Sequence, residues 1–354
     1  MRWQKLFTAS FEESLNLQDD KISGAYSQKA YVETIEVEQK RGRFKSNFIY
    51  ILYSMLFVFG LNYLLVIIAD GIFHTNPDEL TLPISKINFL PNYVFYIGSC
   101  LWLSLIVIGK RISQKFMLSY RLHFHSGVTY LFWFYVETNL LFLTFFAESL
   151  TRVGTLLFLL LVGLIGYVII RSRNLSLLEL MYKKPIEKKK IDQCISSIIG
   201  FIFKYGWGFV LAGLLLKFIF PSSTGVRTDW IGYIGILAIW FILDIAIIAF
   251  ETYLIFPYML QGYYKWKYPE EYREWEGKTI EEWYGEKYLK KQEERKKRNG
   301  MRATGEFARN VYQGAVDNGE TAFYGVVIGL LVVGGIFFYP IVGATGLVVG
   351  SATG

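Results

Sequence analysis

The sequence predicts an all-α polytopic membrane protein with six transmembrane helices, arranged as three hairpins, and a seventh Gly-rich membrane segment at the C-terminus. Composition is the first reason: 53% of the 354 residues are hydrophobic and only 19% are charged, against about 25% charged residues in soluble domains. The second is a series of long apolar runs, and the third is the charge of the loops between them. These features exclude a soluble enzyme, a disordered chain and a disulfide scaffold.

Six apolar runs are long enough for the roughly 20 residues that cross the hydrocarbon core. They comprise residues 48–68, 93–109, 128–147, 153–170, 195–220 and 230–256. A seventh run, residues 323–345, contains Gly334, Gly335 and Pro340. Because Pro removes a helical hydrogen bond, this run is expected to span, to re-enter or to pack along another surface.

Loop charge predicts the orientation, because Lys and Arg resist translocation. Basic residues precede the first run and follow the second, fourth and sixth, while the intervening loops are acidic or poor in charge. We therefore predict a multi-pass plasma-membrane protein, bacterial by its composition. Its expected parts are a cytosolic segment (residues 1–46), a six-helix bundle (47–260), a cytosolic aromatic and charged segment (261–321) and a C-terminal membrane segment (322–354), with the C-terminus outside if that segment spans.

Four of the ionisable residues inside the apolar runs lie away from the outer end, at depths where a charge is costly and usually has a partner, whereas Lys217 is expected to snorkel. Glu137 and Lys204 each lie about 13 Å along their helices, and Asp244 about 21 Å along the sixth, so they could meet near the midplane. Lys204 and Asp244 are the expected ion pair, and Glu251 follows on the face of Asp244. This predicted intramembrane polar cluster is either a structural ion pair or a relay for protons or ions.

No catalytic or metal-binding motif is present, so we predict no catalytic residue, no metal and no cofactor. His123 and His125 form an H-x-H pair with no Cys, Asp or Glu at ligand spacing nearby, which favours an interfacial loop over a metal site. The net charge of +7 is explained by loop orientation, so nucleic acid is not an expected partner.

The segment after the sixth run is dense in both charges and in Tyr and Trp, unlike a solvated linker. Acids after Pro269 and the Thr279 to Glu282 capping-box spacing predict two short helices. The aromatic side chains are expected either to pack on the bundle or the lipid headgroups, or to dock a partner. The candidates for a partner or membrane interface are Trp266, Tyr272, Trp275, Trp283 and Tyr284.

The C-terminal run carries glycines four residues apart, which flatten one helix face and allow close helix packing. This glycine-zipper pattern comprises Gly325, Gly329, Gly346, Gly350 and Gly354.

Three functions remain open. The first is a non-enzymatic partner, accessory or immunity-type subunit of a bacterial membrane complex, with a membrane protein or a second copy as partner and the lipid bilayer around it. The second is an ion- or proton-coupled transporter or channel that uses the midplane acids. The third is an intramembrane enzyme acting on a lipid-linked substrate, which the absence of catalytic motifs disfavours.

Overall fold

The structure, a computed structural model, describes residues 2–40, 52–76, 83, 85–109, 114–219 and 230–298, and over these residues it is helical with no strand. Within this part of the chain, five helical stretches are long and apolar enough to cross a membrane. They are Ser54–Phe73, Asn92–Gly109, Lys115–Phe146, Thr151–Tyr182 and Trp230–Lys267. The all-α class is therefore confirmed for the described residues, and the five apolar helical stretches are consistent with the predicted membrane location.

The count of six spans plus a seventh segment stays a prediction. The fifth predicted run lies in α9 (Lys190–Ile219), a helix that is not among the five. The seventh run and the glycine-zipper positions lie outside the described residues. Three of the spans are also longer than predicted, because their helices continue past the apolar run into polar sequence, as α8 (Thr151–Tyr182) does.

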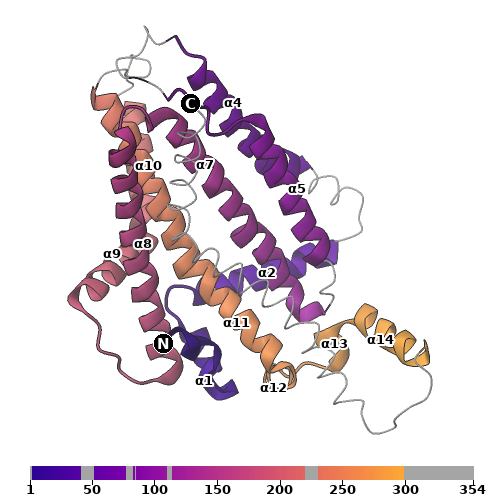
Figure 1. Cartoon of the computed structure of the whole chain (residues 1–354). Coiled ribbons are helices and arrows are strands. Elements are labelled where there is room, and N and C mark those ends of the chain that lie inside the picture. Colours follow the sequence, from indigo (N-terminus) through magenta and orange to yellow (C-terminus); the bar gives the residue numbers. More distant parts are fainter. Residues whose placement is uncertain are drawn as a thin grey trace.

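Helix α7 (Leu131–Phe146) is the centre of the bundle (Figure 1). On one side it packs against α4 (Leu61–Phe73) and α5 (Asn92–Gly109), and on the other against α10 (Trp230–Phe250), which also contacts α8. Trp133 and Leu141 face the α4 and α5 side, whereas Leu143 and Phe146 pack with Trp240. The two sides of α7 thus bury separate clusters.

In the described part of the chain, three helices contain a π-helical segment: η3 (Ser54–Gly60) before α4, η6 (Phe124–Tyr130) before α7 and η7 (Glu251–Ile255) after α10. Segments η6 and η7 contact each other. Gly127 makes this approach possible, because a Cβ there would lie 2.9 Å from the Ile255 side chain. Such π segments interrupt the regular ladder of backbone bonds and occur often at functional sites.

The N-terminal segment covers one end of the bundle. It consists of η1 (Arg2–Phe7), α1 (Phe11–Leu15) and η2 (Asn16–Asp19), followed by α2 (Gly24–Lys40). Ser10 caps α1 in a capping box with Glu13. The segment lies against α8 and against α11 (Phe256–Lys267), the continuation of α10 and η7 (Figure 1).

Three short helices follow α11: α12 (Pro269–Trp275), α13 (Ile280–Tyr284) and α14 (Glu286–Arg298). Pro269 occupies the first turn of α12, and Thr279 caps α13 in the expected capping box with Glu282. Another short stretch, η5 (Lys115–Met117) and α6 (Leu118–His123), leads into η6. The helix starts predicted at Pro269 and Thr279 are confirmed. The second of the two predicted helices is divided into α13 and α14, because Gly285 has a φ of 84°, which ends the helix there.

Candidate functional site: buried acids between the helices

Asp244 lies on α10 and is fully buried. Its Oδ1 accepts a hydrogen bond from the Asn139 amide of α7 at 2.8 Å, while its Oδ2 is buried with no hydrogen-bond partner. The Asn139 Oδ1 accepts from Trp240 Nε1 at 3.0 Å. Because the indole N–H only donates, it fixes the Asn139 amide with its nitrogen toward Asp244.

Glu251 is the first residue of η7 and is 7% exposed. Neither of its carboxylate oxygens has a hydrogen-bond partner. Asp244, Ile248, Glu251 and Ile255 follow each other at intervals of four, three and four residues and are all buried, so they form one face of the continuous α10–η7 helix. Two acids therefore lie one above the other on a buried helix face.

Tyr26 of α2 interacts electrostatically with Glu251. Burial, together with the negative charges of Glu251 and Glu33, raises the pKa of Tyr26 to about 12. The Tyr26 ring also meets the Tyr258 ring edge-on at 6.1 Å. Aromatic hydroxyl-bearing side chains thus lie on the α2 side of Glu251.

A row of buried hydroxyl groups continues from there into α2. The Tyr258 hydroxyl is hydrogen-bonded to Ser119 Oγ, which lies 2.9 Å from Thr34 Oγ1. All three side chains are buried. Thr34 Oγ1 donates its only proton to the Ala30 carbonyl at 2.8 Å, so Thr34 accepts from Ser119, which in turn accepts from Tyr258.

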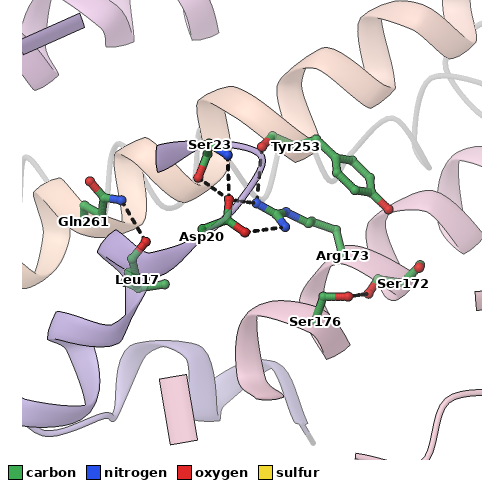
Figure 2. A network of polar contacts seen from close by, with 8 residues as sticks. All are labelled: Leu17, Asp20, Ser23, Ser172, Arg173, Ser176, Tyr253 and Gln261. Carbon is green, nitrogen blue, oxygen red and sulfur yellow. Dashed lines mark hydrogen bonds and ion pairs between the residues drawn. The ribbon is translucent and has the colours of Figure 1, made fainter. Parts of the chain in front are cut away.

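Arg173 of α8 and Asp20, which follows η2, form a buried ion pair beside η7 (Figure 2). Arg173 donates from Nη1 to Asp20 Oδ1 at 3.0 Å and from Nη2 to Asp20 Oδ2 at 2.6 Å. It also donates to the Tyr253 carbonyl at 3.3 Å. Pro257 has no N–H with which to satisfy that carbonyl in an α-helical bond, so Arg173 takes the place of the missing donor.

The N-terminal segment completes this network (Figure 2). Ser23 donates to Asp20 Oδ2 from its backbone N–H at 2.7 Å and from its hydroxyl at 2.5 Å, and Gln261 donates to the Leu17 carbonyl at 3.2 Å. These contacts come from three separate parts of the chain. The N-terminal segment is therefore fixed against α8 and against the π segment that carries Glu251.

Glu137 lies on the opposite side of α7 from Asp244. It is fully buried, and its Oε1 accepts from Trp133 Nε1 at 2.6 Å while its Oε2 has no hydrogen-bond partner. Glu137 shares the α4-facing surface of α7 with Trp133, whereas Asn139, two residues on, is turned by about 200° toward α10. The predicted cluster is thus divided by α7.

The predicted ion pair between Lys204 and Asp244 is not formed. Lys204 is exposed on α9, with its Nζ 5.1 Å from the ring of Tyr205, and no ion pair joins it to Asp244. The reason is that Asp244 faces α7, where Asn139 is its partner. Lys204 therefore does not neutralise a buried acid in this part of the structure.

Most of the aromatic residues predicted as an interface pack inside the chain. Tyr272, Trp283 and Tyr284 are buried, and Trp266 is partly buried against the same cluster. Tyr272 shares a hydrogen bond of 2.9 Å with Ser14, and Trp283 stacks on Phe116 at 4.6 Å between ring centroids. The cluster packs on the N-terminal segment and the bundle. This arrangement corresponds to the expected packing on the bundle, and docking of a partner was the other expectation for these side chains. Trp275 alone of these five candidates remains exposed, at 52%.

His125 is buried beside Gly109, and His123 Nδ1 lies 2.8 Å from the Ser119 carbonyl. The described residues hold no group of three or more His, Cys, Asp or Glu side chains suited to a metal ion.

Comparison with protein-family models, with curated proteins and with solved structures finds no match to this chain.

Proposed function

We propose that this chain is a multi-pass membrane protein that moves protons, alone or coupled to another ion, across the membrane through Asp244 and Glu251. One observation carries the proposal: both acids are buried on one helix face, and Asp244 Oδ2 and both Glu251 oxygens have no hydrogen-bond partner. Neither acid forms an ion pair with a cationic side chain among the described residues. An ionised carboxyl in such surroundings is strongly disfavoured. Each carboxyl is therefore expected to hold a proton while it is buried. If it can release that proton to a neighbouring polar group, it can act in a proton relay.

The hydroxyl row supports a route between Glu251 and the α2 side of the bundle. Tyr258, Ser119 and Thr34 are linked to each other, and Tyr26 meets the Tyr258 ring and interacts electrostatically with Glu251. Hydroxyl groups can both accept and donate a proton. Protons would then pass between Asp244, Glu251 and this row.

Proton flux into liposomes tests the proposal. Full-length protein is reconstituted and proton entry is followed with a trapped pH-sensitive dye after a pH step. We expect Asp244→Asn to reduce flux to the level of protein-free liposomes, while Glu293→Gln, at an exposed position on α14, keeps the wild-type rate. Equal flux from wild-type protein and protein-free liposomes would reject the proposal.

A second candidate function is that of a non-enzymatic subunit of a membrane complex. The observation in its favour is the exposure of Trp275 and Ile280, each 52%, on neighbouring short helices outside the buried aromatic cluster. Exposed Trp is typical of the centres of protein interfaces. Loss of a stoichiometric membrane-protein partner on Trp275→Ala, with folding intact, would support this function over transport, and purification of the wild-type chain without a partner would reject it.

We also propose that the protein lies in the plasma membrane with the N-terminal segment and residues 261–321 in the cytosol. The alternation of basic and non-basic loops supports this orientation. Thiol labelling of a Glu293→Cys variant that lacks Cys100 and Cys194 tests it. The thiol should react with an impermeant reagent only after the membrane is opened, and labelling in intact cells would contradict it.

A further inference from the structure

A second set of unsatisfied polar groups belongs to α4, α5 and α7. These helices pack against one another on the side of α7 that faces away from α10 (Figure 1). Asn62 of α4 is fully buried, and neither atom of its side-chain amide has a hydrogen-bond partner. The hydroxyl of Ser99 on α5 and Oε2 of Glu137 on α7 are also buried without partners. Each of the three helices thus contributes one oxygen-bearing side chain that the protein leaves unsatisfied.

Asn62 belongs to the face of α4 that packs on α7. Val66 and Ala69 follow it at intervals of four and three residues, and both lie in the cluster that contains Trp133 and Leu141 of α7. Glu137 lies midway between those two α7 residues. Asn62 and Glu137 are therefore on facing surfaces of adjacent helices.

Aromatic contacts place Ser99 at the same level. Two ring pairs join the continuous η3–α4 helix to α5, Tyr63 of α4 with Phe95 at 5.3 Å and Phe59 of η3 with Trp102 at 5.8 Å between centroids. Asn62 lies between Phe59 and Tyr63 along that helix, and Ser99 lies between Phe95 and Trp102 along α5. Asn62 and Ser99 therefore lie at the same level along the two packed helices.

Trp133 brings Glu137 to this level. Its ring lies 5.9 Å from Phe95 and 6.2 Å from Trp102, and its indole nitrogen abuts Gly98, the neighbour of Ser99. The same nitrogen donates to Glu137 Oε1. Trp133 thus holds one carboxylate oxygen and leaves the other free beside α4 and α5.

The chemistry of these groups favours a small monovalent cation. One carboxylate, one amide oxygen and one hydroxyl are hard oxygen ligands. A single carboxylate balances one positive charge, whereas a divalent ion would leave an uncompensated charge in apolar surroundings. The described residues hold no second acid, His or Cys grouped with Glu137 in a metal-binding set.

We propose that Asn62, Ser99 and Glu137 bind a sodium ion between α4, α5 and α7. The site is separate from Asp244 and Glu251. A negative result for proton transport would therefore not count against this sodium site. The competing occupant is a proton on Glu137, which would need neither the Asn62 amide nor the Ser99 hydroxyl.

The thermal stability of the full-length protein in detergent tests the site. Tm is compared in sodium chloride and in choline chloride at equal ionic strength, since a ligand that binds only the folded state raises Tm. We expect sodium to raise Tm by on the order of 5 °C, and the rise to disappear in Ser99→Ala and in Glu137→Gln. Ser104→Ala is the matched control, because Ser104 on the same helix donates only to the Cys100 carbonyl of its own helix and is exposed.

Binding of radioactive sodium to the wild-type protein gives a second readout that does not depend on any variant folding. Saturable binding at about one ion per chain, lost in Ser99→Ala and kept in Ser104→Ala, supports the site. No binding and no sodium-dependent Tm overturn it, even if proton flux is present. A Tm that responds to pH but not to sodium, with the response lost only in Glu137→Gln, assigns the site to a proton and also overturns the proposal.

Discussion

Asn139 and Asp244 join the two central helices, because the amide of one donates to the buried carboxylate of the other at 2.8 Å. Trp240 fixes the amide from the α10 side. The contact explains why Asp244 needs no Lys204 to be held in place. It also leaves Asp244 Oδ2 unsatisfied, so the carboxyl is positioned without being neutralised.

Replacing Asn139 by Leu should lower the free energy of unfolding by about 1–3 kcal/mol, because the Asp244 acceptor and the Trp240 donor lose their partner while buried. Thermal unfolding in detergent measures the loss. The double variant Asn139→Leu, Asp244→Leu should lose less than the sum of the two single variants, since no buried carboxylate is left unpaired. Strict additivity would show that the two side chains do not interact.

Arg173→Met should destabilise the folded protein by about 3–5 kcal/mol, because the buried Asp20 carboxylate loses its cationic partner and keeps only the hydrogen bonds from Ser23. The exposed Lys290–Glu286 pair provides the control, and Lys290→Met should cost no more than about 1 kcal/mol. Protease cleavage of the N-terminal segment reports on the same contact and should become faster only in Arg173→Met. Equal stability of the two variants would contradict this role for Arg173.

The same ion pair predicts an acid-dependent loss of stability. Burial alone would raise the pKa of Asp20, but the hydrogen bonds and positive charge of Arg173, with the bonds from Ser23, outweigh burial and lower the pKa below its ordinary value. A carboxyl with a depressed folded-state pKa contributes its stability above its unfolded pKa of about 3.9 and loses it as the pH falls through the lower, folded value. Unfolding measured between neutral pH and pH of about 3 should show this loss in the wild type. A curve of the same shape from Asp20→Asn would assign the acid sensitivity to other groups.

Two Trp residues of the aromatic segment that follows α11 should behave differently. Trp283 is 1% exposed and stacks on Phe116, so Trp283→Ala should cost about 3–5 kcal/mol. Trp275 is 52% exposed, so Trp275→Ala should change the free energy of unfolding by no more than about 0.5 kcal/mol. Thermal unfolding of the two variants checks both values. A large loss in Trp275→Ala without any partner present would show that this residue is part of the fold.

The apolar runs and their spacing were sufficient to predict the membrane-spanning helical class, because a run of this length has few other stable arrangements. Helix starts at Pro269 and Thr279 were also predictable, since capping depends on local sequence. The ends of the helices were not predictable from local sequence. Helix α8 continues through Arg173 to Tyr182, because those polar residues pack against the N-terminal segment instead of entering water.

The side-chain partners of the buried acids depend on packing between distant segments. Sequence spacing favoured Lys204 for Asp244, because the two helices follow each other along the chain. Sequence spacing did not indicate Asn139 as a partner, because Asn139 is uncharged and lies on a helix that is remote in sequence but adjacent in space. Arg173 was counted only as a basic loop residue, and Asp20 showed no signal that tied it to α8.

The most direct test of the proposed relay is proton flux in liposomes that contain the Glu251→Gln variant. Gln keeps the size of the side chain but cannot take up and release a proton, and Glu251 has no hydrogen-bond partner to lose. We predict a variant that folds with wild-type stability, as judged by Tm, and conducts no more protons than protein-free liposomes, while Glu293→Gln retains wild-type flux. Wild-type flux from folded Glu251→Gln would contradict the central claim that the buried acids carry protons.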